Sequence, residues 1–342
     1  MEENSFAENT PAPEQAPAPE QTYVPPSPLN ELNAKVYQIR NEIGKVIVGQ
    51  HQVVDLLLIG LLCDGHLLLE GVPGVAKTLA AKLLSKIIDV DFSRLQFTPD
   101  LMPGDVIGTS VFNPKEGAFY FRPGPIFSNI VLIDEINRSP AKTQSALFEV
   151  MEERQVTVDG DTHIMRYPFL VLATQNPIEQ EGTYRLPEAQ LDRFLFKIEI
   201  GYPSLQEEVN ILTNQQGKTQ TELLQNVTKL LSPGELKNYR QVVQDVMVDA
   251  KIIEYIARII NETRNNPSLY LGASTRASLA LLKSSKACAA IKGRSFVIPD
   301  DVIEMAAPVL RHRIMLTPEK EMEGIDTDDL IQSIIKAMEI PR

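Results

Sequence analysis

A glycine-rich segment between a short apolar run and a helical pattern constrains this chain more than any other sequence feature. The apolar run His66–Glu70 predicts a buried parallel strand, and the spacing from Thr78 to Ile88 predicts a helix. Between them lies Gly71-Val72-Pro73-Gly74-Val75-Ala76-Lys77-Thr78. Glycines let backbone N–H groups turn toward an anion, and the positive end of the following helix faces the same anion. This order predicts a phosphate-binding loop.

Two residues at the end of this loop have the chemistry that a bound nucleotide requires. Lys77 would reach the β- and γ-phosphates of ATP, and the Thr78 hydroxyl would bind Mg²⁺. The residue before the lysine is usually glycine in such loops, and here it is Ala76. Alanine is tolerated where the backbone is helical, but the bare motif leaves a chance glycine-rich turn as the alternative.

Acidic residues end the second buried strand that the sequence predicts, Ile130–Asp134. Asp134 and Glu135 stand at the carboxyl end of this strand, where open α/β sheets place their ligands. Asp134 would bind the magnesium ion directly or through water, and Glu135 would polarise the attacking water as a general base. A solvated acidic turn would explain this strand alone. It does not explain the glycine loop and the acidic strand occurring in this order.

A third predicted strand, Phe169–Thr174, ends close to Asn176. If this strand neighbours the Asp134 strand, the Asn176 amide would hold the lytic water and contact the γ-phosphate. An asparagine that stabilises a turn before Pro177 explains the local sequence equally well. A fourth strand, from Phe194 to Ile200, completes the set of buried strands that the sequence predicts.

The pattern along the chain predicts a tail and two domains. Residues 1–28 are rich in Pro, Glu, Gln and Ala and have few apolar side chains, which predicts a disordered tail. Strands alternate with helices within residues 29–202, which predicts an α/β domain of three layers with a parallel sheet. Residues 203–342 show helical spacing and predict an all-helical domain.

Composition and charge limit the partners and the compartment. The net charge is −12, and without the acidic tail the chain still has 40 acidic against 33 basic residues, which disfavours nucleic acid. We find no signal peptide and no apolar run near the about 20 residues of a transmembrane segment, which leaves membrane-bound partners open. Cys63 and Cys288 lie in apolar helical patterns, which predicts reduced thiols and a cytoplasmic location.

Two further expectations concern the second half of the chain and the histidines. The four histidines show no metal-ligand spacing. His312 stands between two arginines and is expected at the surface of the helical domain or at an interface. Pro308 is expected to kink or divide the helix that begins near Pro299.

Six motifs in order resemble those of one protein family. From about Asn30 to Met315 the chain resembles the MoxR family of AAA+ ATPases, in which alanine before the loop lysine is usual. The motifs are Gly71–Thr78, Gln96–Asp105, Asp134–Pro140, Ala173–Pro177, Glu188–Phe194 and Gly272–Arg276. The resemblance implies an AAA+ parallel-sheet ATPase domain followed by an all-helical lid domain. It also places Val48 and Gly49 where such proteins contact adenine.

The resemblance implies roles for four polar residues. Glu135 would be the catalytic glutamate and Asn176 the sensor-1 residue. Arg193 stands at the arginine-finger position, from which a neighbouring subunit neutralises the negative charge that phosphoryl transfer builds. Arg276 stands at the sensor-2 position, at the start of a lid helix that faces the nucleotide.

The arginine-finger assignment has rivals. The local sequence around Arg193 also fits an arginine that bonds to the last carbonyl groups of a helix. Arg138, Arg154 and Arg185 are further candidates for an arginine at a subunit interface. By analogy with other P-loop enzymes, loss of the finger would cost roughly 10³–10⁵ in rate.

Two hairpins are candidates for contact with other molecules. The first is expected within residues 109–122, and the second within residues 155–165 around Asp159-Gly160. By resemblance to magnesium chelatase and the replicative helicases, these hairpins would line or cap the pore of a ring. Hairpins that only pack against their own domain are the alternative.

The sequence therefore predicts an ATPase that converts ATP and water to ADP and phosphate. By resemblance it would be a homo-oligomer, a hexameric ring, and would remodel or mature protein clients with a partner containing a von Willebrand factor A domain. A DNA-acting or transcription-regulating AAA+ motor is the alternative, which the acidic balance disfavours. A nucleotide-binding switch without turnover is a third hypothesis, against which the intact Lys77, Asp134, Glu135 and Arg193 argue.

Overall fold

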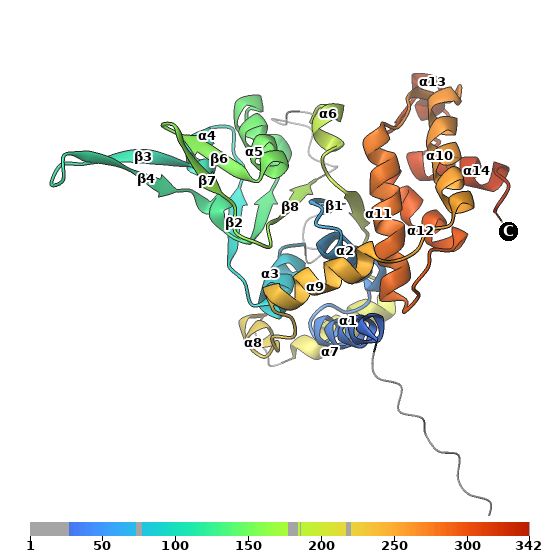
Figure 1. The fold of residues 1–342 in the computed structure, drawn as a ribbon, viewed down its shortest axis with the longest axis horizontal. Helices are drawn as coiled ribbons and strands as arrows, with labels where there is room; N and C mark the ends of the chain where they lie inside the picture. Colours follow the sequence, from blue (N-terminus) through green and yellow to red (C-terminus); the bar gives the residue numbers. More distant parts are fainter. Residues whose placement is uncertain (1–26, 73–76, 177–183, 185, 217–219, 342) are drawn as a thin grey trace, which may run out of the picture.

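The computed structural model describes residues 27–72, 77–176, 184, 186–216 and 220–341. A five-stranded sheet in the order β2-β5-β8-β1-β9 forms its centre (Figure 1). Its strands are β1 (Leu67–Gly71), β2 (Phe92–Gln96), β5 (Ile130–Asp134), β8 (Leu170–Gln175) and β9 (Phe196–Ile200). All neighbouring strands are parallel, so their carboxyl ends lie along one edge of the sheet and their amino ends along the opposite edge.

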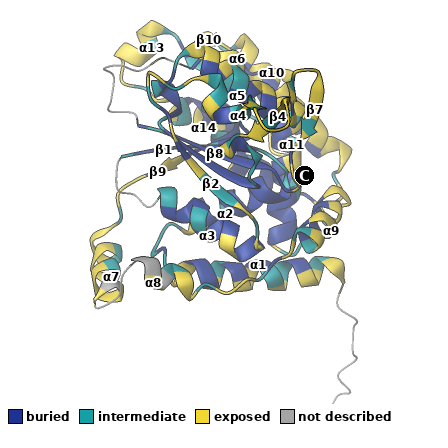
Figure 2. Ribbon diagram, turned by 90° about the vertical axis from the view of Figure 1, so that its left-hand side faces the viewer, coloured by how far each residue is buried: buried dark blue, intermediate teal, exposed yellow. Residues whose placement is uncertain are grey.

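Alternating side chains of the strands pack into two separate cores, one on each face of the sheet. In β1, Leu67 and Leu69 belong to the first core and Leu68 to the second, and all three are fully buried. Figure 2 shows these buried strands between helices on both sides. The first core contains α2 and α3 and the second contains α5, with bounds His51–Leu62, Lys77–Ile88 and Ala141–Glu153. This arrangement confirms the three-layer α/β fold.

A group of helices follows the edge strand β9, and the helix α12 (Pro299–Leu310) of this group packs against that strand. The helices of the group are α7 (Leu205–Gln215), α8 (Gln220–Gln225), α9 (Pro233–Gln244), α10 (Ala250–Asn265), α11 (Thr275–Ile291), α12, α13 (Pro318–Met322) and α14 (Thr327–Ala337). One short antiparallel pair, β10 (Leu269–Leu271) with β11 (Met315–Leu316), interrupts them. The first helix, α1 (Pro28–Gly44), packs against α9 and α11, and Asn33 Nδ2 donates to the Ile291 carbonyl at 2.9 Å. Within the described residues, none of the helices combines the length and the apolar character needed to cross a membrane.

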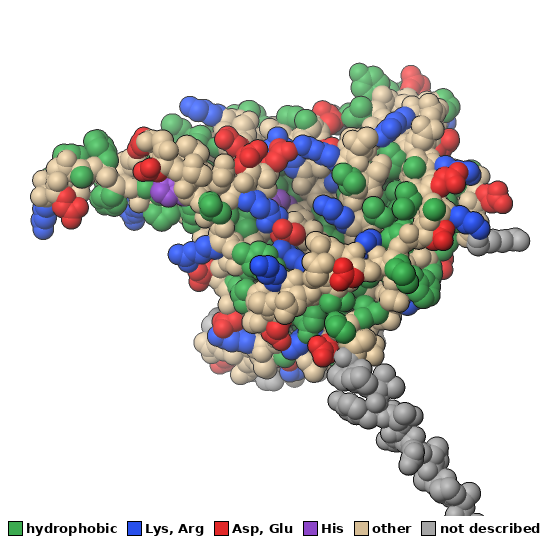
Figure 3. Space-filling view, in the orientation of Figure 1, with side chains coloured by type: hydrophobic (Ala, Val, Ile, Leu, Met, Phe, Trp, Pro, Cys, Tyr) green, Lys and Arg blue, Asp and Glu red, His purple; other side chains and the backbone are tan. Residues whose placement is uncertain are grey.

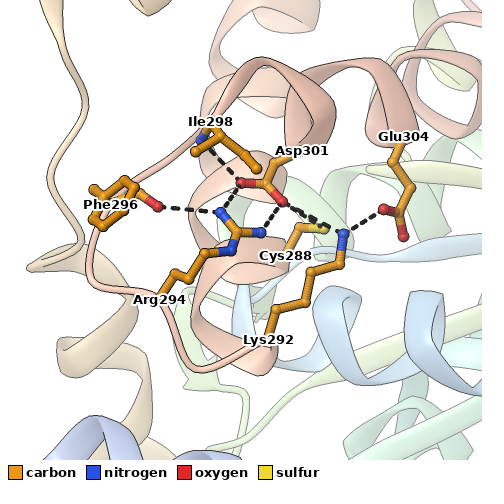
Figure 4. A network of polar contacts seen from close by, with 7 residues as sticks. All are labelled: Cys288, Lys292, Arg294, Phe296, Ile298, Asp301 and Glu304. Carbon is orange, nitrogen blue, oxygen red and sulfur yellow. Dashed lines mark hydrogen bonds and ion pairs between the residues drawn. The ribbon is translucent and has the colours of Figure 1, made fainter.

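A buried carboxylate fixes the start of α12 in this helical group (Figure 4). Asp301 is 0% exposed and accepts hydrogen bonds from Arg294 at 2.5 and 2.6 Å and from the Ile298 backbone N–H at 3.0 Å. Burial alone would raise the pKa of Asp301, but the Arg294 hydrogen bonds and charge bring that pKa below its usual value. Lys292 Nζ lies 3.4 Å from the same carboxylate, so two cations compensate this buried charge, and it would be costly to leave without them.

The structure excludes one of the two expectations for Pro308, a division of the helix. The helix α12 continues through Pro308 to Leu310. The missing N–H and the ring of Pro308 affect the Glu304 carbonyl one turn earlier, and the helix continues past both residues.

Both predicted hairpins are present, and they contact each other. The first joins β3 to β4, the second joins β6 to β7, and the bounds are Gly108–Asn113, Ala118–Pro123, Gln155–Val158 and Asp161–Ile164. The Phe121 ring stacks on the His163 ring with centroids 4.2 Å apart, and the Ser110 hydroxyl donates to the Asp159 carboxylate. Figures 1 and 3 show the first hairpin as an arm that projects far from the body.

Candidate functional site

The predicted phosphate-binding residues lie where β1, between β8 and β9 in the sheet, meets α3. Gly71 ends the strand, Val72 follows it, and Lys77 and Thr78 form the start of α3. The Lys77 Nζ donates to the Gly71 carbonyl at 2.6 Å, which holds the ammonium group beside the end of β1. The other predicted loop residues, Pro73, Gly74, Val75 and Ala76, lie outside the described residues. The described part of the motif therefore stands at the carboxyl edge of the sheet, with a helix N-terminus directed toward it.

The Asp134 carboxylate lies at the same edge, held by residues of both neighbouring strands. Arg94 of β2 donates through Nε to Asp134 Oδ2 at 2.5 Å. The Thr174 hydroxyl of β8 donates to Asp134 Oδ1 at 3.2 Å, and it accepts from the backbone N–H of Glu135 at 3.0 Å. Asp134 is 7% exposed. Two strands thus fix the orientation of the acidic pair.

The backbone of Glu135 adopts a conformation that is uncommon for a residue other than glycine. Its φ of 57° and ψ of 52° are left-handed, and such strain persists mainly where the surrounding structure enforces it, often at functional sites. The Glu135 carboxylate accepts from Gln96 Nε2 at 2.7 Å and pairs with Arg138 Nε at 3.1 Å. The side chain is therefore held toward β2 by two donors.

Asn176, just after the end of β8, is the last predicted site residue that the structure describes at the carboxyl edge. The strand β8 pairs with β5, which confirms the neighbourhood on which the Asn176 prediction depended. Asn176 directly follows β8 and is 7% exposed. Carboxylate and hydroxyl oxygens are ligands that Mg²⁺ prefers, so Asp134 together with Thr78 fits a magnesium ion.

The Val48–Gly49 segment lies between α1 and α2, and the second half of the chain covers it. Gly49 has a φ of +78°, and a β-carbon there would collide with the carboxyl group of Glu207. Glu207 belongs to the first turn of α7, where it accepts from the backbone N–H of Ser204 at 2.7 Å. The backbone angle therefore favours glycine at position 49, whereas the Glu207 side chain can move aside.

The two predicted arginines lie together at the opposite, amino edge of the sheet. Arg193 precedes the start of β9 and donates through Nη1 to the Phe148 carbonyl at 2.6 Å. Arg193 Nη2 lies 2.8 Å from one carboxylate oxygen of Glu152, and Arg276 Nη2 lies 2.6 Å from the other. Arg276 begins α11 as expected. It faces Glu152 at the amino edge, where it does not face the phosphate-binding residues of its own chain.

His66 explains why the end of α5 reaches this edge. His66 directly precedes β1, its Nδ1 accepts from the Val171 N–H at 3.0 Å, and its Nε2 lies 3.0 Å from the Met151 carbonyl. Because Nδ1 accepts, Nε2 carries the proton and donates. Burial, with a smaller effect from the Arg154 charge, lowers the pKa of His66 to about 4. The neutral His66 ring therefore links Met151, next to Glu152 in α5, to the start of β1.

Residues of the helical domain donate hydrogen bonds to the segment that carries Arg193. Arg313, after α12, donates through Nε to Asp192 Oδ1 at 2.7 Å and through Nη1 to the Leu195 carbonyl at 3.0 Å. The Ser274 hydroxyl, which caps α11, donates to Asp192 Oδ2 at 2.8 Å. Burial lowers the pKa of Arg313, and Asp192 opposes that shift. The residues on both sides of Arg193 are thus bound to the same helices that carry Arg276.

The structure excludes one of the two expectations for His312, a position at the surface of the helical domain. This residue is only 6% exposed, and its Nε2 lies 3.0 Å from the Phe194 carbonyl. Burial lowers its pKa well below the usual value. His312 is thus a buried contact between the two domains. Its arginine neighbours suggested a surface, but Arg313 is itself buried against Asp192.

Two of the rival arginines have partners within their own chain. Arg154 donates to the Asp64 carboxylate at 3.1 Å and to the Asp64 carbonyl at 2.9 Å. Arg138 pairs with Glu135, as described above, and Arg185 lies outside the described residues. Arg193 and Arg276 differ from Arg154 because both stand at one surface cluster around Glu152.

Sequence reasoning missed the residues that hold the predicted ones. Gln96 and Arg94 belong to β2, a half-exposed edge strand that lacks a long apolar run. Gln96 opens one of the motifs quoted above, which was the available signal. Glu152 lies in the last turn of α5, where a negative charge opposes the helix dipole. An acid at that position signals a need for a cationic partner.

Comparisons with known proteins agree with this geometry. A family model for the ATPase family associated with various cellular activities (AAA) matches residues 66–196, which include the central strands. A model for the AAA lid domain matches residues 261–334 in the helical group. A crystal structure of a candidate ATPase from Cytophaga hutchinsonii superposes with a TM-score of 0.84 at 42% identity, covering 92% of this chain and 97% of that chain.

Curated relatives are similar along nearly the whole chain. The uncharacterized protein YeaC of Bacillus subtilis is 50% identical over 299 residues, covering 87% of this chain and 92% of that protein. The protein Chaperone MoxR1 of Mycobacterium tuberculosis is 44% identical over 330 residues, covering 93% of this chain and 86% of that protein. Protein MoxR of Paracoccus denitrificans is 29% identical over 317 residues, covering 86% of this chain and 93% of that protein. With the fold and these similarities in agreement, the chain belongs to the MoxR family of AAA+ ATPases.

Proposed function

We propose that this protein hydrolyses ATP with Mg²⁺ in a ring oligomer and acts as a chaperone-like remodelling or maturation factor for other proteins. One observation carries the proposal. The residues suited to bind and cleave ATP lie at one edge of the sheet, and the arginines suited to neutralise the transition state lie at the other. A single chain therefore has only part of such a site.

The carboxyl edge supplies binding and water activation. Lys77 and the N-terminal turn of α3 bind the phosphates, and Thr78 and Asp134 hold the magnesium ion. When bound, Mg²⁺ neutralises charge on the β- and γ-phosphate oxygens. Glu135 accepts the proton of the attacking water, and Asn176 orients this water toward the γ-phosphate.

The amino edge supplies cations to a second copy. Arg193 and Arg276 meet the nucleotide of a neighbouring subunit when copies associate head to tail, and a heterologous contact of this kind closes into a ring if its rotation permits. A guanidinium there neutralises the equatorial oxygens of the transferred phosphoryl group. We propose a hexamer as the closed form.

The projecting arm is the proposed site of contact with protein clients. Phe112, Phe119 and Tyr120 on β3 and β4 are 50%, 71% and 49% exposed, and large apolar side chains at such exposure suit transient contact with other chains. Since the arm and the second hairpin contact each other, they can move as a unit around a ring pore. A partner with a von Willebrand factor A domain completes the proposed machine.

Further proposals concern location and domain division. Both Cys63 and Cys288 are free thiols, which supports a cytoplasmic location. We place the ATPase domain at residues 29–202 and the lid at 203–342. Of the tail expected at residues 1–28, Ser27 caps and Pro28 begins α1, and the rest lies outside the described residues. The change from strands to helices after β9 supports a boundary there.

Affinity capture tests the proposed function against a DNA-acting motor. The Glu135→Gln protein, loaded with ATP, is purified from its own cells and its co-purifying molecules are identified. We expect protein clients and a partner with a von Willebrand factor A domain, captured with ATP and not with ADP. Capture of DNA fragments without a protein partner would replace this proposal by the motor hypothesis, which the net charge of −12 disfavours.

A further inference from the structure

We infer that Glu152 is a positioning residue that holds Arg193 and Arg276 side by side, so that both act as one element on the nucleotide of a second copy. This inference rests on the proposed function, because it requires the two arginines to work between subunits. Glu152 itself does not contact the nucleotide in this account; it acts through the two arginines.

The contacts of Glu152 are divided equally between the two domains. One carboxylate oxygen pairs with Arg193 of the α/β domain at 2.8 Å, and the other pairs with Arg276 of the lid at 2.6 Å. A guanidinium has five N–H donors, and each of these pairs uses one nitrogen. Arg193 also donates through Nη1 to the Phe148 carbonyl and its Nε is buried, so its donors for phosphate oxygens are the second N–H groups of Nη1 and Nη2. Arg276 has further N–H groups besides the one on Glu152, and the carboxylate sets the spacing between the two arginines.

The small contribution of the cluster to stability supports a functional role. Within the cluster two arginines share one glutamate, while Glu149 and Glu153 also line a cavity beside Arg193. The side chains of Glu152, Arg193 and Arg276 are 37%, 30% and 51% exposed, so the ion pairs themselves contribute little to stability. Since Glu152 also opposes the dipole of α5, stability gives little reason for an acid at this position.

The surroundings make the cluster a rigid unit. Asp192 binds Ser274 and Arg313, so the backbones that carry both arginines are fixed to each other. The Phe148 carbonyl holds Arg193 as well, whereas the Arg276 guanidinium pairs with Glu152, which thereby joins the two side chains. A cavity of about 190 Å³ lined by His66, Glu152 and both arginines adjoins the cluster.

Steady-state kinetics of Glu152→Ala test the positioning role. We expect kcat for ATP to fall roughly 10–100-fold, because a displacement of about 1 Å at a reacting geometry costs that much, while KM changes less than about threefold. The kcat of Glu152→Gln should lie between those of Glu152→Ala and the wild type, since the amide has only one acceptor oxygen for two arginines. Glu262→Ala is the matched control, because it removes the same charge from an exposed residue in the last turn of another helix, α10, where an acid also opposes the helix dipole, and it should keep kcat within about twofold.

Mixing with a binding-deficient subunit separates positioning from general damage. A Glu152→Ala subunit keeps its own phosphate-binding residues, so Lys77→Ala subunits with intact arginines should restore its turnover. A kcat of Glu152→Ala equal to that of the control, or a loss that Lys77→Ala subunits do not restore while they restore Arg193→Ala, would overturn the role of Glu152 and leave the proposed function intact. If Arg193→Ala is not restored either, the intersubunit action proposed above is wrong.

Discussion

The two edges of the central sheet differ in what their polar groups do in the isolated chain. At the carboxyl edge, Asp134 and Glu135 are acids held in place by donors from β2 and β8. At the amino edge, Arg193 and Arg276 are cations gathered around one acid that both share. All five strands are parallel, so the carboxyl ends of the strands lie at one edge of the sheet and their amino ends at the other. Asp134 and Glu135 stand at the end of a strand, whereas Arg193 precedes one, and they therefore lie at opposite edges.

This difference supports the proposal that the ATP site is divided between copies of the chain. The carboxyl edge has its own cations, Lys77, Arg94 and Arg138, but Arg94 and Arg138 are paired with the two acids of that edge. The amino edge lacks the phosphate-binding residues and the base that phosphoryl transfer needs. Assembly would bring the two edges together and make turnover depend on the oligomer.

Removing the finger at the amino edge should have the largest effect. Arg193→Ala is expected to lower kcat roughly 10³–10⁵-fold, because the charge on the equatorial phosphoryl oxygens loses its neutralising partner. Nucleotide affinity, measured with a fluorescent ATP analogue, should stay close to that of the wild type. Arg258→Ala serves as the control, since Arg258 is exposed on α10 and pairs only with Glu254 among the described contacts. Equal losses in both variants would contradict the assignment.

Removing the base at the carboxyl edge should have the next largest effect. Glu135→Gln is expected to lower turnover roughly 10²–10⁴-fold, because the amide cannot take the proton of the attacking water. ATP should still bind and should promote assembly, as measured by light scattering. Steady turnover by this variant would show that another group is the base.

Loosening the base without removing it should have a smaller effect. Gln96→Ala deletes the donor 2.7 Å from the Glu135 carboxylate, and we expect kcat to fall about tenfold with KM unchanged. Arg138 remains as the second donor, which limits the loss. A rise in turnover would show instead that Gln96 restrains Glu135 in an unproductive orientation.

Protonation of His66 at acid pH should lower the free energy of unfolding, because this buried histidine is neutral in the folded chain. Its pKa is about 4 in the folded chain and about 6.5 when unfolded, so between these values the unfolded chain binds more protons. The contribution of neutral His66 to the free energy of unfolding is therefore present above pH 6.5 and is lost as the pH falls toward 4. Its upper limit is on the order of 3 kcal/mol. Thermal unfolding from pH 7.5 to 4 should show a shallower decline for His66→Gln than for the wild type. Parallel curves would contradict this origin of the pH dependence.

Sequence patterns predicted the parts of the fold that repeat a strong local signal. The apolar runs of β1, β5, β8 and β9 and the glycine loop were sufficient for the α/β fold and for the carboxyl edge of the site. The edge strand β2 was missed because it is half exposed and carries Ser93, Arg94 and Gln96 among its five residues. Its two site residues, Arg94 and Gln96, were missed with it.

The amino edge was harder to predict because it depends on contacts between distant segments. Glu152, Arg193 and Arg276 come from three elements, and no local pattern shows that one carboxylate lies between the two arginines. The sensor-2 expectation placed Arg276 opposite its own nucleotide. The actual position follows from the lid packing beside β9, which brings the start of α11 to the amino edge.

Mixing two inactive variants tests the divided site most directly. Arg193→Ala keeps an intact carboxyl edge, and Lys77→Ala keeps an intact amino edge. In an equal mixture that assembles at random, roughly a quarter of the subunit contacts pair two intact edges, so ATPase activity should return to roughly a quarter of the wild-type value. Activity that stays at the level of the separate variants at every mixing ratio, although mixed oligomers form, would contradict a site divided between copies.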